Sequence, residues 1–302
     1  MLIVITGPTA TGKTALGVAL ARALGGEIVS ADSRQIYRGM DLGTGKDLDE
    51  YGKVPYHMID IAPAGYKYNL YEYVRDARQA IADIESRGKQ PILVGGTGLY
   101  VETLLKGIVL PDVPENPALR QSLEGKSLGE LTSILCTMKR LHNTTDVDTA
   151  KRAIRAIEIE TYYKAHPEAA EQAKPHPIEA ITFMVDIPRD ERRRRISERL
   201  RRRLDAGMID EVRRLLDSGI PAEDLEYYGL EYKYLTQYCT GRLDYEEMVS
   251  GLETAIHQFA KRQMTWFRGM ERRGFILHPI PYDIEHSDFI AKVREAIASK
   301  QA

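Results

Sequence analysis

A glycine-rich segment near the start of the chain, GPTATGKT at residues 7–14, has the residue types and spacing of a phosphate-binding loop. Its glycines let backbone N–H groups converge on phosphate oxygens, Lys13 adds a positive charge, and Thr14 offers a hydroxyl to Mg²⁺ or phosphate. A helical pattern follows, so the positive end of a helix would point at the anion. We therefore expect phosphate contacts from Gly7, Pro8, Thr9, Ala10, Thr11, Gly12, Lys13 and Thr14.

A second polar segment, ADSRQIY at residues 31–37, follows the next apolar run of the chain. In a parallel sheet Asp32 would lie near the phosphate loop, where a carboxylate can hold Mg²⁺ through water or act as a general base. Arg34 adds a charged clamp, and the Gln35 amide suits an adenine edge. The alternative is an Asx turn with exposed polar neighbours, and the residues alone leave both interpretations open.

A third glycine-rich segment, GGTGLY at residues 95–100, follows another apolar run. Its glycines allow a ligand to approach the backbone closely, and Thr97 offers a hydroxyl. A tight strand-to-helix turn without any ligand explains the same residues equally well. This segment therefore gains meaning only if it lies beside the first two.

Two cationic segments occur after residue 188. RDERRRRISERLRRR (189–203) contains nine arginines and three acids, so most of these arginines should face solvent while one helix face meets anions. In FAKRQMTWFRG (259–269), Arg262 lies where it could follow a phosphate backbone, and Gln263 interrupts an apolar stripe. We interpret Trp266, the sole tryptophan, as a core anchor.

The elements that must position these residues alternate between strand and helix. Buried strands are expected at 2–6, 27–30 and 91–94, and helices at 13–24 and 71–87. This alternation predicts an α/β fold with a P-loop NTPase-like parallel sheet covered by helices on both faces. The three polar segments would then meet at the carboxyl ends of the strands.

A helical, charged stretch separates two parts of this predicted core. Proline clusters, PDVPENP and KPHP, bound it, and AITFMVD (180–186) then returns to a strand pattern. We therefore predict a catalytic core formed by residues 1–110 and 180–302, interrupted by a small helical insertion domain at 111–179.

Bulk properties exclude several classes of protein. A net charge of −2 over 302 residues gives no global attraction to nucleic acid, so any such binding needs local basic patches. The two cysteines, Cys136 and Cys239, form no CxxC pair, and no apolar stretch approaches membrane-spanning length. We expect a cytoplasmic protein without membrane contact. A monomer is the working expectation.

Taken together, GPTATGKT, ADSRQIYRGMDLGTGK, VPYHMIDI, PILVGGTGLYVETLLKG, KRAIRAIEI and FAKRQMTWFR resemble, in order and spacing, the tRNA dimethylallyltransferases. The resemblance covers residues 3–110 strongly and 148–160 and 190–270 more loosely. It implies transfer of a dimethylallyl group from dimethylallyl diphosphate to N6 of adenosine 37, beside the tRNA anticodon, with Mg²⁺ as cofactor.

The resemblance also assigns roles to individual residues. The loop from Gly7 to Thr14 would grip the diphosphate, Thr14 would hold the metal, and Asp32 would take the N6 proton. With Lys13, Thr14 and Asp32, Arg199 completes the implied catalytic set by reaching the diphosphate. Contacts to the anticodon stem-loop are implied for Asp32, Ser33, Arg34, Gln35, Thr97, Arg120, Lys151, Arg152, Ala153, Ile154, Arg155, Arg262 and Gln263.

Three alternatives use the same motifs differently. An adenylate isopentenyltransferase would share the donor but accept AMP or ATP, and would have no use for the insertion or for KRAIR. A P-loop small-molecule kinase would use the arginine helix as a lid and consume ATP. An RNA-binding protein with a degenerate loop would not need Lys13, Thr14 and Asp32 intact.

Overall fold

The computed structural model describes residues 1–302 except 109–112, 142–144, 173 and 302. The chain divides into two compact units, one formed by residues 1–107 and 177–302 and the other by residues 108–176. The boundary predicted between residues 110 and 111 lies outside the described residues. Each unit has its own apolar core.

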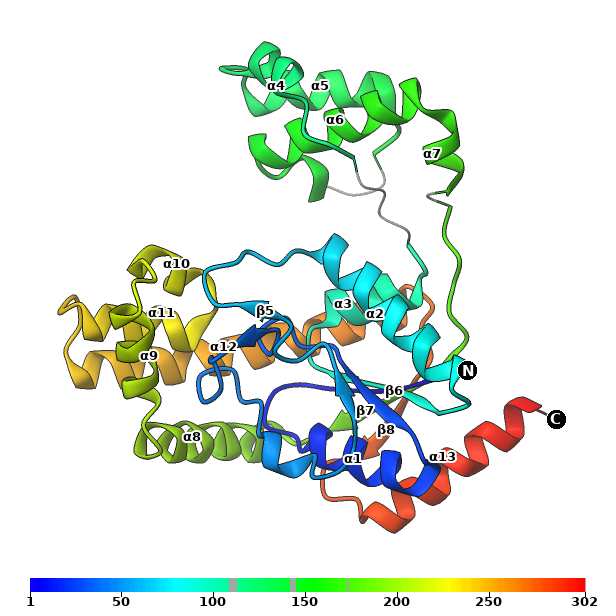
Figure 1. Ribbon diagram of the computed structural model, residues 1–302, viewed down its shortest axis with the longest axis vertical. Helices are drawn as coiled ribbons and strands as arrows, with labels where there is room; N and C mark the ends of the chain where they lie inside the picture. Colours follow the sequence, from blue (N-terminus) through cyan, green and yellow to red (C-terminus); the bar gives the residue numbers. More distant parts are fainter. Residues whose placement is uncertain (109–112, 142–144, 173, 302) are drawn as a thin grey trace. The chain divides into compact units, whose positions relative to one another are not determined.

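The larger unit is built on a six-stranded sheet in which every neighbouring pair is parallel (Figure 1). The predicted α/β fold is therefore confirmed. In spatial order the strands are β4 (Tyr56–His57), β2 (Glu27–Ser30), β6 (Pro91–Gly95), β1 (Leu2–Thr6), β7 (Ala180–Asp186) and β8 (Leu277–Pro281). A separate two-stranded sheet pairs β3 (Tyr37–Arg38) with β5 (Ala62–Pro63).

The register of the sheet brings three strand ends level. Thr6 at the end of β1 pairs with Gly95 of β6, and Ser30 at the end of β2 pairs with Val94. Because parallel strands place their carboxyl ends at the same edge, the segments that follow β1, β2 and β6 emerge side by side. All residues of these three strands are buried, as expected for a sheet covered on both faces.

Helices cover both faces of the sheet. On one face, α1 (Lys13–Leu24) and α13 (His286–Gln301) lie close together and bury Leu16, Leu20 and Phe289. The other face packs against α2 (Leu70–Ser86), α3 (Gly98–Leu105) and the 28-residue α12 (Tyr245–Arg272). The remaining helices of the larger unit are α8 (Arg189–Asp205), α9 (Met208–Asp217), α10 (Ala222–Tyr227) and α11 (Leu230–Cys239), with a short 3₁₀ turn η1 (Leu48–Glu50).

The smaller unit is helical. It contains α4 (Pro117–Leu123), α5 (Leu128–Met138), the 3₁₀ turn η2 (Thr145–Val147), α6 (Ala150–Ala165) and α7 (Pro167–Gln172). Leu131 and Leu135 of α5 pack against Ala153 and Ile157 of α6. A capping box of Ser127 and Glu130 begins α5, since each side chain bonds the other's backbone N–H.

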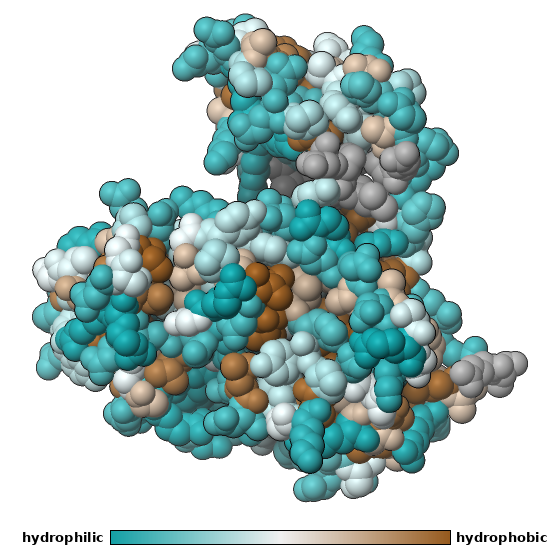
Figure 2. All heavy atoms as spheres, viewed as in Figure 1, coloured by the Kyte–Doolittle hydropathy of each residue, from teal (hydrophilic) through white to brown (hydrophobic). Residues whose placement is uncertain are grey.

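The face of the larger unit seen in Figure 2 is mostly polar. In Figure 2, hydrophilic residues cover most of the visible face of the larger unit, with hydrophobic residues scattered among them. Within the described parts of the chain, no helix is both long enough and apolar enough to span a bilayer.

Candidate functional site

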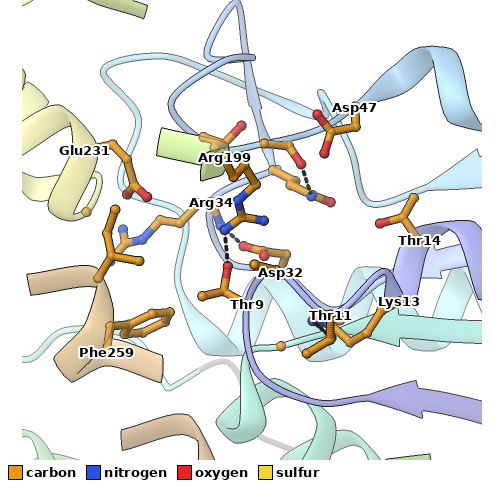
Figure 3. A pocket seen from close by; sticks show the side chains of 18 of the residues that line it. Thr9, Thr11, Lys13, Thr14, Asp32, Arg34, Asp47, Arg199, Glu231 and Phe259 are labelled. Atoms are coloured by element: carbon orange, nitrogen blue, oxygen red, sulfur yellow. Dashed lines mark hydrogen bonds between the residues drawn. The ribbon is translucent and has the colours of Figure 1, made fainter. Parts of the chain in front are cut away.

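A cavity of about 1130 Å³ lies at the carboxyl edge of the sheet in the larger unit. Its walls come from the loops after β1, β2 and β6, from residues 42–45, and from α8 and α12 (Figure 3). The three polar segments singled out in the sequence therefore line one cavity. Two positions of the phosphate loop, Gly7 and Pro8, are not among the lining residues.

The phosphate loop is shaped by its glycines. Gly7 has φ +146°, and a Cβ there would lie 3.0 Å from the Val185 carbonyl oxygen. Gly12, with φ +80°, caps the N-terminus of α1, which is left with open backbone N–H groups as in other anion-binding helix starts. Lys13 Nζ donates to the Pro8 carbonyl at 2.6 Å and lies 3.4 Å from the Thr11 hydroxyl. The loop thus folds its own cation back over its backbone.

The charge state of Lys13 is sensitive to its surroundings. Burial, and then the nearby Arg199 guanidinium, lower the pKa of Lys13 to about 7, while Asp32 opposes the shift. An ammonium without an anionic partner is costly to bury. A diphosphate in the cavity would supply that partner, so the site is electrostatically prepared for an anion.

Three arginines at four-residue spacing share the face of α8 that meets the cavity. Arg195 Nη1 lies 3.4 Å from the Ala10 carbonyl, Arg199 donates to the Thr9 hydroxyl, and Arg203 pairs with Asp47 at 3.2 Å. Burial, followed by the charge of Arg203, lowers the pKa of Arg199 to about 10. By contrast, Arg194, which also lines the cavity, already pairs with Glu191 and Glu198 of its own helix.

Asp32 combines both interpretations of its sequence. Its Oδ1 accepts a hydrogen bond from the Arg34 backbone N–H at 2.9 Å, which is an Asx turn, and its side chain also lines the cavity beside Lys13 and Arg199 (Figure 3). Thr97 Oγ1 accepts from the Ser33 N–H at 3.0 Å and so joins the loop after β6 to the loop after β2. A hydrogen-bonded turn therefore presents the carboxylate to the cavity.

The two neighbours assigned to adenine contact are already engaged. The Gln35 side chain is 8% exposed, accepts from Ser30 Oγ at 3.0 Å and donates to the Gly45 carbonyl at 3.1 Å. Arg34 donates to the Tyr227 carbonyl at 3.2 Å. Gln35 therefore ties two cavity walls together, and its contact with a base stays a prediction that requires these bonds to exchange.

Gln263 of α12 pins two loops at once. Its Oε1 accepts from the Thr9 N–H at 2.9 Å and its Nε2 donates to the Gly96 carbonyl at 2.8 Å. This explains a polar residue that is only 8% exposed within an apolar helix face. The amide fixes the phosphate loop relative to the glycine loop after β6.

The core assignment of Trp266 is wrong. Trp266 is 38% exposed and lines the cavity, and a Cβ on Gly98 would lie 2.3 Å from its Cδ1. Phe259 is likewise 39% exposed and faces the cavity. The buried stripe of α12 continues instead through Ala260, Met264 and Phe267 because these positions keep the helical period of the stripe. The aromatic residues therefore belong to the site.

In the smaller unit, several residues assigned to tRNA contact have partners in the protein. Glu158, 2% exposed, accepts from Arg120 at 3.1 and 3.0 Å and from Arg155. Burial raises the pKa of Glu158, but hydrogen bonds from Arg120, the Asn116 N–H and Arg155 outweigh this and lower it to about 2. Arg120 and Arg155 thus brace this unit and keep part of each side chain at its surface.

The KRAIR stretch is divided between surface and core. Lys151 and Arg152 are exposed, and Arg152 pairs with Asp148, which precedes the N-cap of the helix. Ala153 is fully buried against α5, and Ile154 is partly buried beside it. Counting Ala153 as a surface for RNA was therefore wrong, because the helical period turns it into the core.

Several cavity residues had no assigned role in the sequence. Arg203, Asp47 and the turn at 43–45 line the cavity, and burial raises the pKa of the cavity residue Glu231 against the opposing charges of three arginines. The glycines of GTGK were a usable signal, because Gly45 has φ +69° and a Cβ there would collide with Arg203. Glu231 carries no motif signal.

Among the cavity side chains considered for a metal, oxygen atoms are the groups that could bind a hard cation such as Mg²⁺. Thr14, the second residue of α1, lines the cavity, and among the described residues no group of three or more His, Cys, Asp or Glu could hold a metal ion. Mg²⁺ keeps several waters and commonly combines one protein oxygen with substrate phosphates. The cavity therefore fits Mg²⁺ that arrives with a diphosphate.

Family models match most of the chain. The model described as IPP transferase matches residues 35–270, and the one described as isopentenyl transferase matches residues 1–53. Among curated relatives, tRNA dimethylallyltransferase 1 of Porphyromonas gingivalis is 63% identical over 92% of each chain. tRNA dimethylallyltransferase 2 of Bacteroides fragilis is 58% identical over 98% of this chain and 97% of that protein.

Solved structures have the same fold. A full-length tRNA isopentenylpyrophosphate transferase of Bacillus halodurans superposes with a TM-score of 0.72 at 31% identity, over 99% of this chain and 96% of that one. A eukaryotic dimethylallyltransferase acting on tRNA gives a TM-score of 0.80 at 24% identity, over 97% of this chain and 77% of that one, which supports the fold alone.

Proposed function

We propose that this protein prenylates tRNA. The chain belongs to the IPP transferase family, and its curated relatives include tRNA dimethylallyltransferases. It is a prenyltransferase with a P-loop NTPase-like fold. It transfers a dimethylallyl group from dimethylallyl diphosphate to N6 of adenosine 37, beside the anticodon, and releases diphosphate. No nucleotide is hydrolysed in this reaction, and we place it in the cytoplasm.

The first requirement of the reaction is departure of the diphosphate. The allylic carbon–oxygen bond breaks when the negative charge that develops on the leaving group is stabilised. The start of α1, with its open N–H groups, lines the cavity together with Lys13 and Arg199, so these groups are available to stabilise that charge. Mg²⁺ held by Thr14 and phosphate oxygens would supply further charge stabilisation.

The second requirement is a competent nucleophile. The N6 lone pair of adenine is delocalised into the ring, so the amine needs to lose a proton as it attacks. Asp32 accepts that proton while the new carbon–nitrogen bond forms and the carbon–oxygen bond to diphosphate breaks. The Asx turn and the Ser33–Thr97 bond hold Asp32 in place for this step.

The acceptor must bring its base to the cavity. Adenosine 37 lies stacked in the anticodon loop and has to leave the stack to reach an enclosed carbon. Trp266 and Phe259 offer aromatic faces for bases, and Arg262 offers charge to the phosphate backbone. Lys151 and Arg152 of the insertion supply a second cationic surface for the stem-loop.

One observation carries the proposal: an anion cradle and a carboxylate, Lys13 with Arg199 and Asp32, share a single cavity. To test it, the enzyme is incubated with radiolabelled dimethylallyl diphosphate and unmodified tRNA, AMP or ATP, with and without Mg²⁺. The label should enter tRNA and neither AMP nor ATP, and nuclease digestion of the product should locate it at adenosine 37. Product from AMP alone would instead assign an adenylate isopentenyltransferase, and ATP consumption without prenyl transfer would assign a kinase.

A further inference from the structure

A carboxylate outside the cavity holds one of the cavity walls. Glu211 lies in the first turns of α9 and is 3% exposed. Its Oε2 accepts from the backbone N–H groups of Asp41 at 2.9 Å and Leu42 at 2.8 Å, and its Oε1 accepts from the Gly43 N–H at 3.0 Å. Three consecutive amides of the 41–45 turn thus point at one side chain.

A fourth donor completes this arrangement. The Tyr232 hydroxyl of α11 donates to Glu211 Oε1 at 2.6 Å, and its ring packs so closely on Gly43 that a Cβ there would lie 2.7 Å from it. All four partners are donors, so they suit a carboxylate, which only accepts hydrogen bonds. An amide in its place would direct its NH₂ group, itself a donor, at other donors. Such a buried charge is tolerated only when it is fully hydrogen-bonded.

The held turn reaches the reacting groups on two sides. Its Gly45 carbonyl accepts from Gln35 Nε2 at 3.1 Å, and Gln35 belongs to the same segment as Asp32. On the other side the Arg203 guanidinium lies directly over Gly45, one helical turn along α8 from Arg199. The turn is therefore wedged between the general base segment and the arginine face that meets the diphosphate.

We propose that Glu211 is a positioning residue for prenyl transfer, which fixes the 41–45 turn so that Gln35 and Arg203 keep the donor end of the cavity in its productive shape. The proposal rests on the proposed function. Glu211 acts through the backbone amides of this turn and does not itself touch either substrate. Because the turn adjoins the arginine face, loss of the Glu211 carboxylate should weaken use of the donor much more than it weakens tRNA binding.

The test compares Glu211→Gln and Tyr232→Phe with Glu223→Gln, a matched glutamate that is exposed at the start of α10. For Glu211→Gln we expect kcat/KM for dimethylallyl diphosphate to fall about tenfold or more, with the Kd for tRNA within about twofold of wild type. Tyr232→Phe removes one of four donors and should lose less, and Glu223→Gln should match wild type. Glu211→Asp, which keeps the acceptors, should recover part of the loss.

Two outcomes would overturn the inference. One is a folded Glu211→Gln variant, by circular dichroism, with wild-type kinetic constants for the donor. The other is an equal loss of tRNA affinity and donor affinity, which would indicate general damage to the fold. If Glu211→Gln does not fold, Tyr232→Phe carries the test alone, since unchanged donor kinetics there would also refute the role. Absence of prenyl transfer by the wild-type enzyme would refute the proposed function instead.

Discussion

The lowered pKa of Lys13 makes a quantitative prediction about donor binding. In the free enzyme Lys13 loses its proton near pH 7, because burial and Arg199 disfavour its charge. About one pH unit above that pKa only roughly one tenth of the enzyme carries the charged lysine, and about two units above only roughly one hundredth. Bound diphosphate restores the charge by raising the pKa of Lys13. Donor affinity should therefore decline towards tenfold per pH unit above neutrality.

The measurement is calorimetric titration with dimethylallyl diphosphate between about pH 6 and pH 9. Lys13→Arg serves as the control, since an arginine stays charged over this range and meets the same ionisation states of the donor. Its affinity should be lower but its pH profile flatter than that of the wild type. Identical slopes in the two enzymes would refute the reasoning.

The causes of the shift give a second, opposed pair of variants. Removing the neighbouring positive charge in Arg199→Gln should move the decline to higher pH, because a repulsion that lowers the pKa of Lys13 is gone. Removing the negative charge in Asp32→Asn should move it to lower pH. The pH at which donor affinity declines is compared separately from the affinity itself, because both substitutions also change the affinity. Shifts in the same direction would show that the coupling is misassigned.

Three further predictions concern the general base, the aromatic wall of the cavity and a partly buried ion pair outside it. Asp32→Ala should abolish prenyl transfer in single-turnover assays while leaving tRNA binding largely intact, and retained chemistry with lost binding would contradict its role. Gly98→Ala should displace Trp266 from the cavity wall, because the new Cβ would lie 2.3 Å from the indole, and should change its fluorescence and raise the KM for tRNA. Hydrogen bonds from Arg87 lower the pKa of Glu27 to about 2, so stability present above the ordinary carboxyl pKa should be lost as pH falls through about 2. Glu27→Gln should lower the free energy of unfolding at neutral pH by about 2 kcal/mol, a value discounted because Arg87 is 41% exposed. Urea unfolding at neutral and acid pH measures this difference.

The parts of the fold that the sequence predicted are those with strong local signals. Strands β1, β2, β6 and β7 are apolar and β-branched because they are buried on both faces, so their pattern is continuous. Strand β8, LHPIP, gave no such pattern. It lies at the edge of the sheet, where prolines are tolerated because the outer N–H groups need no partner.

Side-chain orientation was predicted less well than position. The sequence placed Trp266 on α12 but assigned it to the core, because a large apolar residue near the apolar stripe of a helix usually packs inside. Gly98 leaves room for the indole at the cavity wall, and that contact joins residues far apart in the sequence. The four-donor nest around Glu211 is likewise set by three distant segments, so no local pattern could reveal it.

The cavity is lined by both charged and apolar side chains, and this combination influences which product forms. Cations alone would suit phosphoryl transfer, yet Ile256, Phe259 and Trp266 line the same cavity as Lys13 and Arg199. A carbon that loses diphosphate becomes electron-poor and reacts readily with water, so a prenyltransferase must exclude water at that carbon while it keeps the diphosphate solvated by fixed charges. The apolar residues would shield the five-carbon group, in addition to the base contacts proposed for Phe259 and Trp266, and the charged residues would hold the phosphates. We infer that shortening Phe259 would be seen first as a side product, prenyl alcohol formed by hydrolysis, before it is seen as slower binding.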